Sequence, residues 1–512
     1  MAPRESAPIP PADSEFSTVR FLLDGAPVRV ADVPPTTTVL EYLRENLHRT
    51  GTKEGCAEGD CGACTVVLGE LSHDGATVGY RAVNSCIRLL PTIDGQELVT
   101  VESLKAPDGT LHPVQQAMVD HHASQCGFCT PGFVMSLFAL YLQREAPTRG
   151  EVLDALSGNL CRCTGYRPII DAAINMGAYP VPAHWSQEQA RTSARVRSLQ
   201  ALRRERSLSI PGFHAPRSID ELAAAIEADP DAVLLAGGTD IGLWVTQQLR
   251  ELPSIIYIGE VAELKRIRRD AAGTVIGAAV PLTEGWAAIV SVYPALAELA
   301  LRFGSPPVRN SGTLCGNIAN GSPIGDAMPA LIALGAQIEL RRGAHTRHLP
   351  LDQFYLGYQK KDLSAGEFIV SVSVPAPRPG LRLASYKLSK RFDQDISAVC
   401  AAFAVDCDGD RITAARIAFG GLAAIPARAR ATEAALIGRP WHHDSFEGAV
   451  PALAEDFKPL TDLRASSEYR LRGAGNLLRR FYLQFADERG RSATATGLAN
   501  AMRTADLATR AD

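Results

Sequence analysis

The sequence predicts a multidomain protein of the α+β class. Its 512 residues exceed one ordinary hydrophobic core, since long chains divide at roughly 100 to 200 residues per domain. Stretches of short apolar strands with turn signals alternate with stretches of helical periodicity. Eight of the eleven cysteines fall between residues 56 and 163, which sets that part of the chain apart from the rest.

Composition and charge are those of an average soluble globular protein, with 46% hydrophobic and 21% charged residues. The net charge of -4 is not the basic charge that is typical of nucleic-acid-binding proteins. No apolar run reaches the roughly 18 to 20 residues that span a bilayer. The first fifteen residues are rich in proline and lack the apolar core of a secretory signal. We therefore expect a cytoplasmic protein that binds neither membranes nor nucleic acid.

The N-terminal part predicts a small α+β domain. Residues 17–31 read as a β-hairpin that turns at Asp24-Gly25, and Thr37 or Thr38 can cap the helix that follows. After a glycine-rich cysteine loop, further strands are expected at 65–70 and 98–104.

The next part predicts a short helical bundle. Pro131 suits the first turn of a helix capped by Thr130. Thr148 and Glu151 have the spacing of a capping box and open a second helix, which is expected to end at Gly158-Asn159. A third helix is expected from Pro168.

The rest of the chain alternates strands and helices after a polar, basic stretch that we interpret as a solvated linker. A hairpin over 397–421 is expected to turn at Asp408-Gly409, and Gly438 closes the helix that follows. Strands are expected at 232–238, 254–260 and 274–280, and helices at 219–228, 328–336 and 429–438. The predicted units are a domain at 16–100, a helical domain at 101–180, a linker at 181–208, a domain at 209–376 and a C-terminal α+β domain at 380–490.

Three cysteines in one loop and a fourth downstream form the first constellation. Cys56, Cys61 and Cys64 have the spacing C-x4-C-x2-C, and Cys86 follows them. This is the spacing of plant-type 2Fe-2S ferredoxins. Glycines in the loop let the backbone bend around the irons and direct N-H groups at the sulfurs. Structural zinc and a disulfide framework are the alternatives, but zinc sites usually show two C-x2-C-like pairs and disulfides conflict with the inferred compartment.

A second constellation follows in the helical part. Cys126 and Cys129 form C-x2-C directly before a helix N-terminus, and Cys161 and Cys163 form C-x-C after a helix stop. Alone, this set is compatible with zinc or with one iron-sulfur cluster. Beside the first set, a cluster is the better interpretation.

The two sets, in this order and with these intervals, resemble the iron-sulfur half of the molybdenum hydroxylases, the family of xanthine dehydrogenase and aldehyde oxidase. The resemblance extends through the later domains. It implies a β-grasp 2Fe-2S ferredoxin domain, a helical-bundle 2Fe-2S domain, an FAD domain of the vanillyl-alcohol-oxidase type and a small C-terminal α+β domain. Gln125 matches a family glutamine near the pterin of the molybdenum cofactor in the partner, and a helix-cap contact is the alternative.

Two polar, glycine-rich segments resemble the FAD-binding stretches of this family. The segment 234–243 is a strand that runs into paired glycines, whose N-H groups can form an anion nest, although such turns are also common structural elements. The segment 303–326 is long and polar, as functional loops are. By the resemblance Phe303 would stack on adenine, with an ordinary core aromatic as the alternative. The implied FAD contacts are Leu234, Leu235, Ala236, Gly237, Gly238, Thr239, Asp240, Ile241, Phe303, Thr313, Leu314, Cys315, Gly316, Asn317, Asp326, Ile369 and Lys387.

Cys315 departs from the family pattern, which commonly has Gly-Gly-Asn where this chain has Cys315-Gly316-Asn317. If the first position requires a positive φ, the local geometry of this loop must differ. We do not interpret Cys315 as catalytic.

Tyr358 and the segment 387–395, which includes Asp395, resemble the parts that face the flavin and the nicotinamide in dehydrogenase members. A surface tyrosine and a charged strand end are the alternative. Because no G-x-G-x-x-G follows a strand, NAD is expected to bind on the flavin face rather than in a Rossmann domain.

The resemblance implies an electron-transfer subunit. Electrons from a molybdopterin cofactor on a partner large subunit would pass through the two 2Fe-2S clusters to FAD and leave as hydride to NAD, in a heterotetramer of two small and two large chains. The presence of the clusters and FAD on one chain favours the xanthine dehydrogenase branch. That branch oxidises hypoxanthine and xanthine to urate in purine catabolism. The same role with an aldehyde or another heterocycle is the alternative. A free-standing redox sensor is disfavoured because the chain has no DNA-binding motif.

Overall fold

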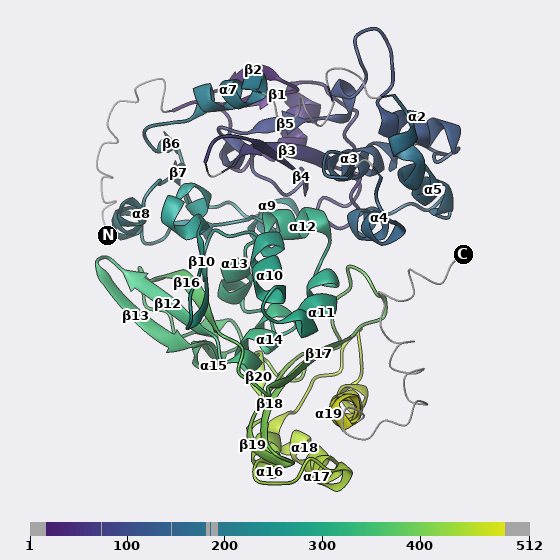
Figure 1. The fold of residues 1–512 in the computed structure, drawn as a ribbon. Helices are drawn as coiled ribbons and strands as arrows, with labels where there is room; N and C mark the ends of the chain where they lie inside the picture. Colours follow the sequence, from purple (N-terminus) through teal and green to yellow (C-terminus); the bar gives the residue numbers. More distant parts are fainter. Residues whose placement is uncertain (1–16, 73, 145, 181–184, 186–192, 487–512) are drawn as a thin grey trace.

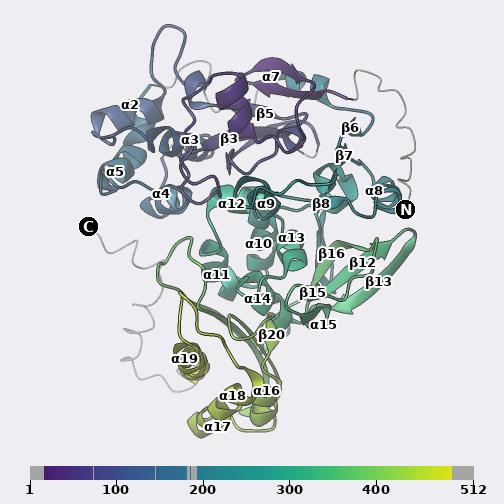
Figure 2. The same cartoon turned by 180° about the vertical axis from the view of Figure 1, so that it is seen from behind.

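The computed structural model describes residues 17–72, 74–144, 146–180, 185 and 193–486. We name four parts: the sheet region (17–100), the helical region (101–180), the middle region (209–376) and the C-terminal region (380–486). Figure 1 shows the sheet and helical regions side by side above the middle region, with the C-terminal region at the opposite end, and Figure 2 shows the same order from behind. The α+β class predicted from the sequence is confirmed. No helix in these ranges is both long and apolar enough to cross a membrane.

The sheet region is a five-stranded mixed sheet in the order β2-β1-β5-β3-β4, with β1 and β5 parallel. The predicted hairpin turns at Asp24-Gly25, where both residues have positive φ. Thr38 caps the helix through a capping box with Glu41. The segment expected as a strand at 98–104 leaves the sheet after Val99 and continues as a 3-10 turn. The elements are β1 (Val19–Leu23), β2 (Ala26–Val30), α1 (Val39–Glu41) with a π-helical turn (Tyr42–Asn46), β3 (Thr65–Leu71), β4 (Val78–Asn84) and β5 (Glu97–Val99).

The helical region holds the three expected helices and one more. Thr148 and Glu151 form the predicted capping box. Thr130 is not the cap of its helix: the helix begins at Thr130 itself, Cys129 takes the cap position, and the Thr130 hydroxyl pairs with that of Ser124 at 2.7 Å. The helices are α2 (Pro113–Asp120), α3 (Thr130–Tyr141), α4 (Arg149–Leu156) and α5 (Arg167–Asn175).

The stretch expected as a solvated linker contains a helix, α7 (Ser193–Leu202), although residues 181–184 and 186–192 lie outside the described ranges. Val196 and Leu199 are buried against the sheet and helical regions. Arg204 is also buried, and its guanidinium forms an ion pair with Asp94 at 2.5 Å. A solvated basic run therefore does not describe this part, because its apolar residues and one arginine pack on the sheet region.

The described part of the middle region contains two larger sheets, a two-stranded sheet of β14 (Tyr355–Gly357) and β15 (Lys360–Lys361), and a group of helices (Figure 1). In the first sheet, ordered β6-β7-β9-β8, strands β7, β9 and β8 are parallel. Its elements are β6 (Leu208–Ile210), β7 (Phe213–Ala215), α8 (Ile219–Ala228), β8 (Val233–Leu235), α9 (Ile241–Thr246) and β9 (Ile255–Tyr257). The antiparallel second sheet, ordered β10-β11-β16-β12-β13, and its helices comprise β10 (Ile267–Arg269), β11 (Gly273–Gly277), α10 (Leu282–Val290), α11 (Ala297–Leu301), α12 (Pro306–Ser311), α13 (Leu314–Asn320), α14 (Ala327–Leu334), β12 (Gln337–Arg342), β13 (His345–Pro350) and β16 (Phe368–Pro375).

The C-terminal region is an antiparallel sheet, β17-β18-β19-β20, covered by helices. The predicted hairpin is present, but Asp408 still pairs with Arg411, so the turn lies at Gly409-Asp410, one residue later than expected. Its main elements are β17 (Arg382–Leu388), β18 (Val399–Asp408), β19 (Arg411–Gly420), β20 (Ala427–Arg428), α16 (Arg430–Leu436), α17 (His443–Ala449) and α19 (Ser467–Ala486).

Hydrophobic cores cross the borders between these regions. Phe21 and Leu43 of the sheet region share one core with Phe213 and Tyr257 of the middle region. A second core joins strands of the sheet region to α3 and α7. A third joins α14 to strands β18 and β19 of the C-terminal region. The regions are therefore held together by packed apolar side chains and not by the connecting chain alone.

Candidate iron-sulfur and flavin sites

In the first cysteine loop, backbone N-H groups point toward a cysteine sulfur of the same loop. Cys56 Sγ accepts backbone N-H groups from Glu58 at 3.5 Å and from Cys61 at 3.4 Å. Gly59 and Gly62 have positive φ, which allows the sharp bends of the loop. A Cβ added to Gly55 would lie 2.7 Å from Cys61 Sγ, so a side chain there would displace the sulfur.

The four sulfur atoms of this set form one cluster of contacts. Hydrogen bonds from Cys61 and Cys86 hold the pKa of the Cys56 thiol well below its ordinary value. A hydrogen bond from Cys86 lowers the pKa of Cys64 despite burial, while the same bonds raise the pKa of the two donors. Cys64 and Cys86 are only 1% and 2% exposed, whereas Cys56 and Cys61 are half-buried. The sulfurs thus converge from a loop and from the turn after β4, as four ligands of one cluster must.

The second cysteine set lies at the surface of the helical region. Cys126 contacts Cys163, and Cys129 contacts Cys161, so the two motifs meet across the ends of α3 and α4. Burial and the hydrogen bond with Cys161 raise the pKa of Cys129 to about 12. In Cys161, burial raises the pKa, but hydrogen bonds from Thr164 outweigh it and the net shift is downward. Cys126 and Cys163 are exposed.

Both sets fit a binuclear cluster. A 2Fe-2S cluster takes four thiolates, two on each iron. The donors that converge in each set are four cysteines, the soft ligands that iron-sulfur clusters require.

The first cysteine set also touches the middle region through α9. Gln247 Nε2 donates to Cys56 O at 2.9 Å, and Thr246 Oγ1 donates to Ala57 O at 2.7 Å. Gly242 lies so close to Ile87, the neighbour of Cys86, that a Cβ on this glycine would be 2.6 Å from the Ile87 carbonyl oxygen. These contacts were not predicted, because nothing in the sequence marks a glutamine or threonine as a partner of a distant loop.

The two segments expected to bind FAD lie against each other. The chain leaves β8 after Leu235, and a Cβ on Gly237 would lie 2.0 Å from Ser311 O. Thr313 caps α13 by accepting the Gly316 N-H at 3.0 Å. Asn317 Oδ1, one turn after Thr313 on α13, is buried and accepts no hydrogen bond from any described residue. The pair of loops thus combines close backbone approach with a polar atom that lacks a partner, which fits a bound polar cofactor.

The other expected FAD contacts are buried at the border with the C-terminal region. Lys387 Nζ forms an ion pair with Asp326 at 2.6 Å and donates to Arg302 O at 3.1 Å. Phe303 packs on Trp286, with ring centroids 5.9 Å apart, and Ile369 lies on β16 with 8% exposure. The structure brings Asp326 and Lys387 into direct contact, while Ile369 lies on a separate strand. The assignment of all these residues to FAD stays a prediction.

Cys315 shows no strain in this structure. It lies in the first turn of α13 and is absent from the described residues with positive φ. Its side chain is buried in the core, 3.8 Å from Ile276 O, and burial raises the pKa of the thiol to about 12. The positive φ considered for this position is therefore not adopted, and the thiol points into the apolar core.

Of the residues expected near nicotinamide and pterin, Tyr358 and Gln125 are exposed and Asp395 is half-buried. Tyr358 follows β14 (Tyr355–Gly357) and is 65% exposed. Asp395 accepts N-H groups from Lys390 at 2.8 Å and Arg391 at 2.9 Å, and these bonds lower its pKa although burial opposes them. Gln125 is exposed beside Cys126. Their proposed roles stay predictions.

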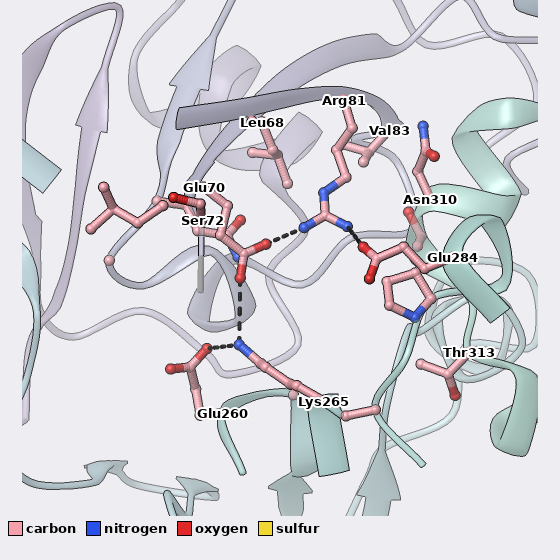
Figure 3. A pocket seen from close by; sticks show the side chains of 18 of the residues that line it. Leu68, Glu70, Ser72, Arg81, Val83, Glu260, Lys265, Glu284, Asn310 and Thr313 are labelled. Atoms are coloured by element: carbon pink, nitrogen blue, oxygen red, sulfur yellow. Dashed lines mark hydrogen bonds and ion pairs between the residues drawn. The ribbon is translucent and has the colours of Figure 1, made fainter. Parts of the chain in front are cut away.

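A cavity of about 890 Å³ separates the sheet region from the middle region. Figure 3 shows the ion pairs in it. Two of them join the sheet region to the middle region: Glu70 binds Lys265 at 3.4 Å, and Arg81 is 3.8 Å from Glu284. Within its own region, Glu70 also binds Arg81, and Lys265 binds Glu260 at 3.4 Å. The two pairs between regions were not visible in the sequence, since their members are far apart along the chain.

Family models match the four regions in order. The matches are a 2Fe-2S iron-sulfur cluster binding domain at residues 21–89, a 2Fe-2S binding domain at 100–174, an FAD binding domain in molybdopterin dehydrogenase at 206–377 and a CO dehydrogenase flavoprotein C-terminal domain at 384–485. The two cluster models contain the cysteine sets, and the FAD model contains both glycine-rich segments.

Whole-chain relatives agree with these matches. The chain is 31% identical to xanthine dehydrogenase of Emericella nidulans over 86% of its own length, and 30% identical to xanthine dehydrogenase 1 of Arabidopsis thaliana over 86%. The chain belongs to the molybdenum hydroxylase family. This molybdenum hydroxylase chain carries two 2Fe-2S domains and an FAD-binding domain. It spans only 36% and 38% of the length of those two relatives.

Solved structures of the family are similar over about half of the chain. A carbon monoxide dehydrogenase from Hydrogenophaga pseudoflava aligns with a TM-score of 0.50 and 32% identity, covering 52% of this chain and 94% of that one. A chain of quinoline 2-oxidoreductase from Pseudomonas putida 86 aligns with a TM-score of 0.50 and 26% identity, covering 54% and 97%.

Replacing Cys129 with Ser tests the second cluster. We expect the Cys129→Ser protein to lose that cluster while keeping the first cluster and FAD, because the first cysteine set and the flavin loops do not use this thiol. Iron content per chain and electron paramagnetic resonance (EPR) of the reduced protein measure the change. Cys407→Ser, at the far end of β18, is the control and is expected to keep both clusters. Retention of both cluster signals in Cys129→Ser contradicts the assignment.

Replacing Glu70 with Gln tests the ion pairs of the cavity. Arg81 and Lys265 outweigh the effect of burial and lower the pKa of Glu70 to about 2. A carboxylate with a depressed pKa stabilises the fold above its ordinary pKa, and this contribution is lost as pH falls toward the depressed value. We expect Glu70→Gln to lower stability by roughly 1 to 2 kcal/mol at pH 7 and by less as pH falls below about 4.5.

Thermal unfolding of both proteins between pH 3 and 7 measures this difference. Glu263→Gln, on an exposed turn beside Lys265, is the matched control. An equal loss of stability at all pH values would show that the carboxylate charge is not responsible.

Proposed function

We propose that this chain is the electron-transfer subunit of a xanthine dehydrogenase. In this proposal a partner large subunit holds the molybdopterin cofactor and oxidises hypoxanthine and xanthine to urate. The present chain holds two 2Fe-2S clusters and FAD and delivers the electrons to NAD. The assembly would be a heterotetramer of two small and two large chains.

The observation that carries the proposal is the opposite burial of the two cysteine sets. In the second set Cys126 and Cys163 are exposed, and Phe128, two residues after Cys126, is 49% exposed. In the first set Cys64 and Cys86 are buried beneath α9 of the middle region. In the proposal the set with exposed thiols receives electrons from the partner, and the set nearer α9 passes them to the flavin region.

The relatives support the choice of substrate. The matched proteins of Emericella nidulans, Arabidopsis thaliana and mouse bear the names xanthine dehydrogenase or xanthine dehydrogenase/oxidase, and they match 86 to 92% of this chain. The chain covers 36 to 39% of their length, which leaves room for a molybdenum part outside it.

The chain itself places and tunes its cofactors. When bound, the clusters carry single electrons and FAD exchanges between one-electron and two-electron transfer. Backbone N-H groups of the first cysteine loop hydrogen-bond Cys56 Sγ, which stabilises negative charge there. The paired loops at Gly237 and Thr313 provide the close backbone approach that a pyrophosphate needs, and Asn317 offers a buried polar group.

NADH formation from xanthine by this chain, purified with its native partner, tests the proposal. We expect a rate that depends on both chains and on NAD. If xanthine gives no rate but an aldehyde or another heterocycle bleaches the cluster and flavin absorbance, the electron path stands and the substrate is wrong.

A sister branch of the family is the second candidate. The similarity to a carbon monoxide dehydrogenase and to a quinoline 2-oxidoreductase favours it, because these proteins share the fold and act on other substrates by their names. The same bleaching experiment with a panel of substrates separates the two.

Replacing Gly237 with Ala tests the FAD loops. The added Cβ would lie 2.0 Å from the Ser311 carbonyl oxygen, so the two loops must separate. Because overpacking of this kind costs about 1 to 3 kcal/mol, we expect FAD retention to weaken by about tenfold while both clusters remain. FAD released per chain after gel filtration measures the effect. Gly448→Ala, on α17 with open space around it, is the control. Unchanged FAD content in Gly237→Ala would remove this loop from the flavin site.

A further inference from the structure

A short turn after α4, Gly158–Leu160, lies where three regions meet. On one side, a Cβ on Gly158 would be 2.7 Å from the Ser305 side chain of the middle region. On the other side, a Cβ on Gly62 of the first cysteine loop would be 2.1 Å from Gly158 O. The backbones therefore approach as closely as two glycines allow. Cys161, a member of the second set, follows this turn directly.

The side chain of Asn159 joins the two cysteine sets. It is 2% exposed, and its Nδ2 donates to Gly62 O at 3.1 Å and to Thr65 Oγ1 at 3.4 Å. Its Oδ1 accepts the hydroxyl of Ser136, on α3, at 2.7 Å. The amide is thus bonded on one side to the loop of the first set and on the other to the helix that begins at the second set.

A backbone hydrogen bond lies beside this amide. Leu160 N donates to Cys61 O at 2.9 Å. Cys61 belongs to the first set, and Leu160 is bonded covalently to Cys161 of the second. Cys61 and Cys161, one expected ligand from each cluster, are therefore linked through covalent bonds and a single hydrogen bond.

The side chain of Asn159 does more than end helix α4. Its backbone N-H already closes the last turn of α4 by donating to Leu156 O at 2.9 Å. The side chain is not needed for that role and is directed instead to Gly62, across the border between regions. The Gly62 carbonyl oxygen also accepts from Thr65 Oγ1 at 2.7 Å, so Asn159 completes an existing network.

A nearby ion pair anchors the same turn to the middle region. Arg309, on α12, binds Asp154 of α4 at 2.7 Å and donates to Leu301 O and Gly304 O. The turn cannot move relative to the middle region without disturbing either this pair or the contact of Gly158 with Ser305. Asn159 is the side chain that bonds this anchored turn to the first cysteine loop.

We propose that Asn159 is a positioning residue that sets the distance and electronic contact between the two clusters through its bond to Gly62 and the adjacent Leu160–Cys61 hydrogen bond. The inference rests on the proposed presence of both clusters. It does not depend on the substrate, the flavin or NAD.

Asn159→Ala in the full chain, purified with its cofactors, tests the proposal. We expect both clusters to be retained and their mutual magnetic interaction in the EPR spectrum of the fully reduced protein to weaken. Electron transfer between the clusters after rapid photochemical reduction is expected to slow about tenfold, since the buried Gly62 carbonyl loses the donor that ties it to the turn after α4 and keeps only donors from Thr65. Unchanged interaction and rate with both clusters present would overturn the proposal.

Two further variants make the result specific. Ser136→Ala removes only the hydroxyl that orients the amide, and a smaller loss of the same interaction is expected. If Asn159→Ala does not retain both clusters, Ser136→Ala decides, and an unchanged interaction there overturns the proposal. Asn175→Ala, whose Nδ2 donates to Asp171 O on α5 away from both sets, is the control and is expected to match the natural protein.

The failure of the proposed function is recognised separately. If the natural protein itself contains fewer than two clusters by iron content, the electron-transfer function is wrong. If it contains two clusters that interact and Asn159→Ala leaves them unchanged, only the role of Asn159 is wrong.

Discussion

The sharing of hydrophobic cores across region borders is the constraint on which the other features of this protein depend. Electron transfer needs fixed distances between cofactors, and fixed distances need regions that do not move relative to each other. Phe21 and Leu43 are packed with Phe213 and Tyr257 in one core, although nearly 200 residues of chain separate the two pairs. A close-packed interior has few alternative arrangements, so the site that each region carries stays in place.

Glycines allow the backbones of neighbouring segments to approach closely where the regions are packed together. At Gly62, Gly237 and Gly242 a Cβ would lie within 2.6 Å of a backbone carbonyl oxygen from another segment. In two of these three places the close segment belongs to another region: the cysteine loop meets the end of α4, and α9 meets the turn at Ile87. The absence of side chains shortens the paths between the two cysteine sets and between the first set and the flavin loops. Polar side chains such as Asn159 and Gln247 then hydrogen-bond the backbone of the neighbouring region and hold the close segments together.

Sequence reasoning worked where local rules determine the structure. The turn at Asp24-Gly25, the capping boxes at Thr38 and Thr148 and the helix at 219–228 follow from residue types within a few positions of one another. The cysteine sets were recognised by spacing, and their convergence in space agrees with it. The buried helix α7 and the ion pairs around Glu70 were missed, because they depend on partners that come together only after folding. The position of the thiol of Cys315 was likewise not readable from its neighbours, since a helix and not a turn occupies that point.

The burial of Cys64 and Cys86 has a consequence for how the protein matures. Both thiols lie under α9 and are almost inaccessible in the folded chain. We therefore expect iron and sulfide to reach these two thiols before the middle region docks, whereas Cys126 and Cys163 stay open to the solvent afterwards. In that order of events the inner cluster is assembled while the chain folds, and the outer cluster can still be inserted into the folded protein.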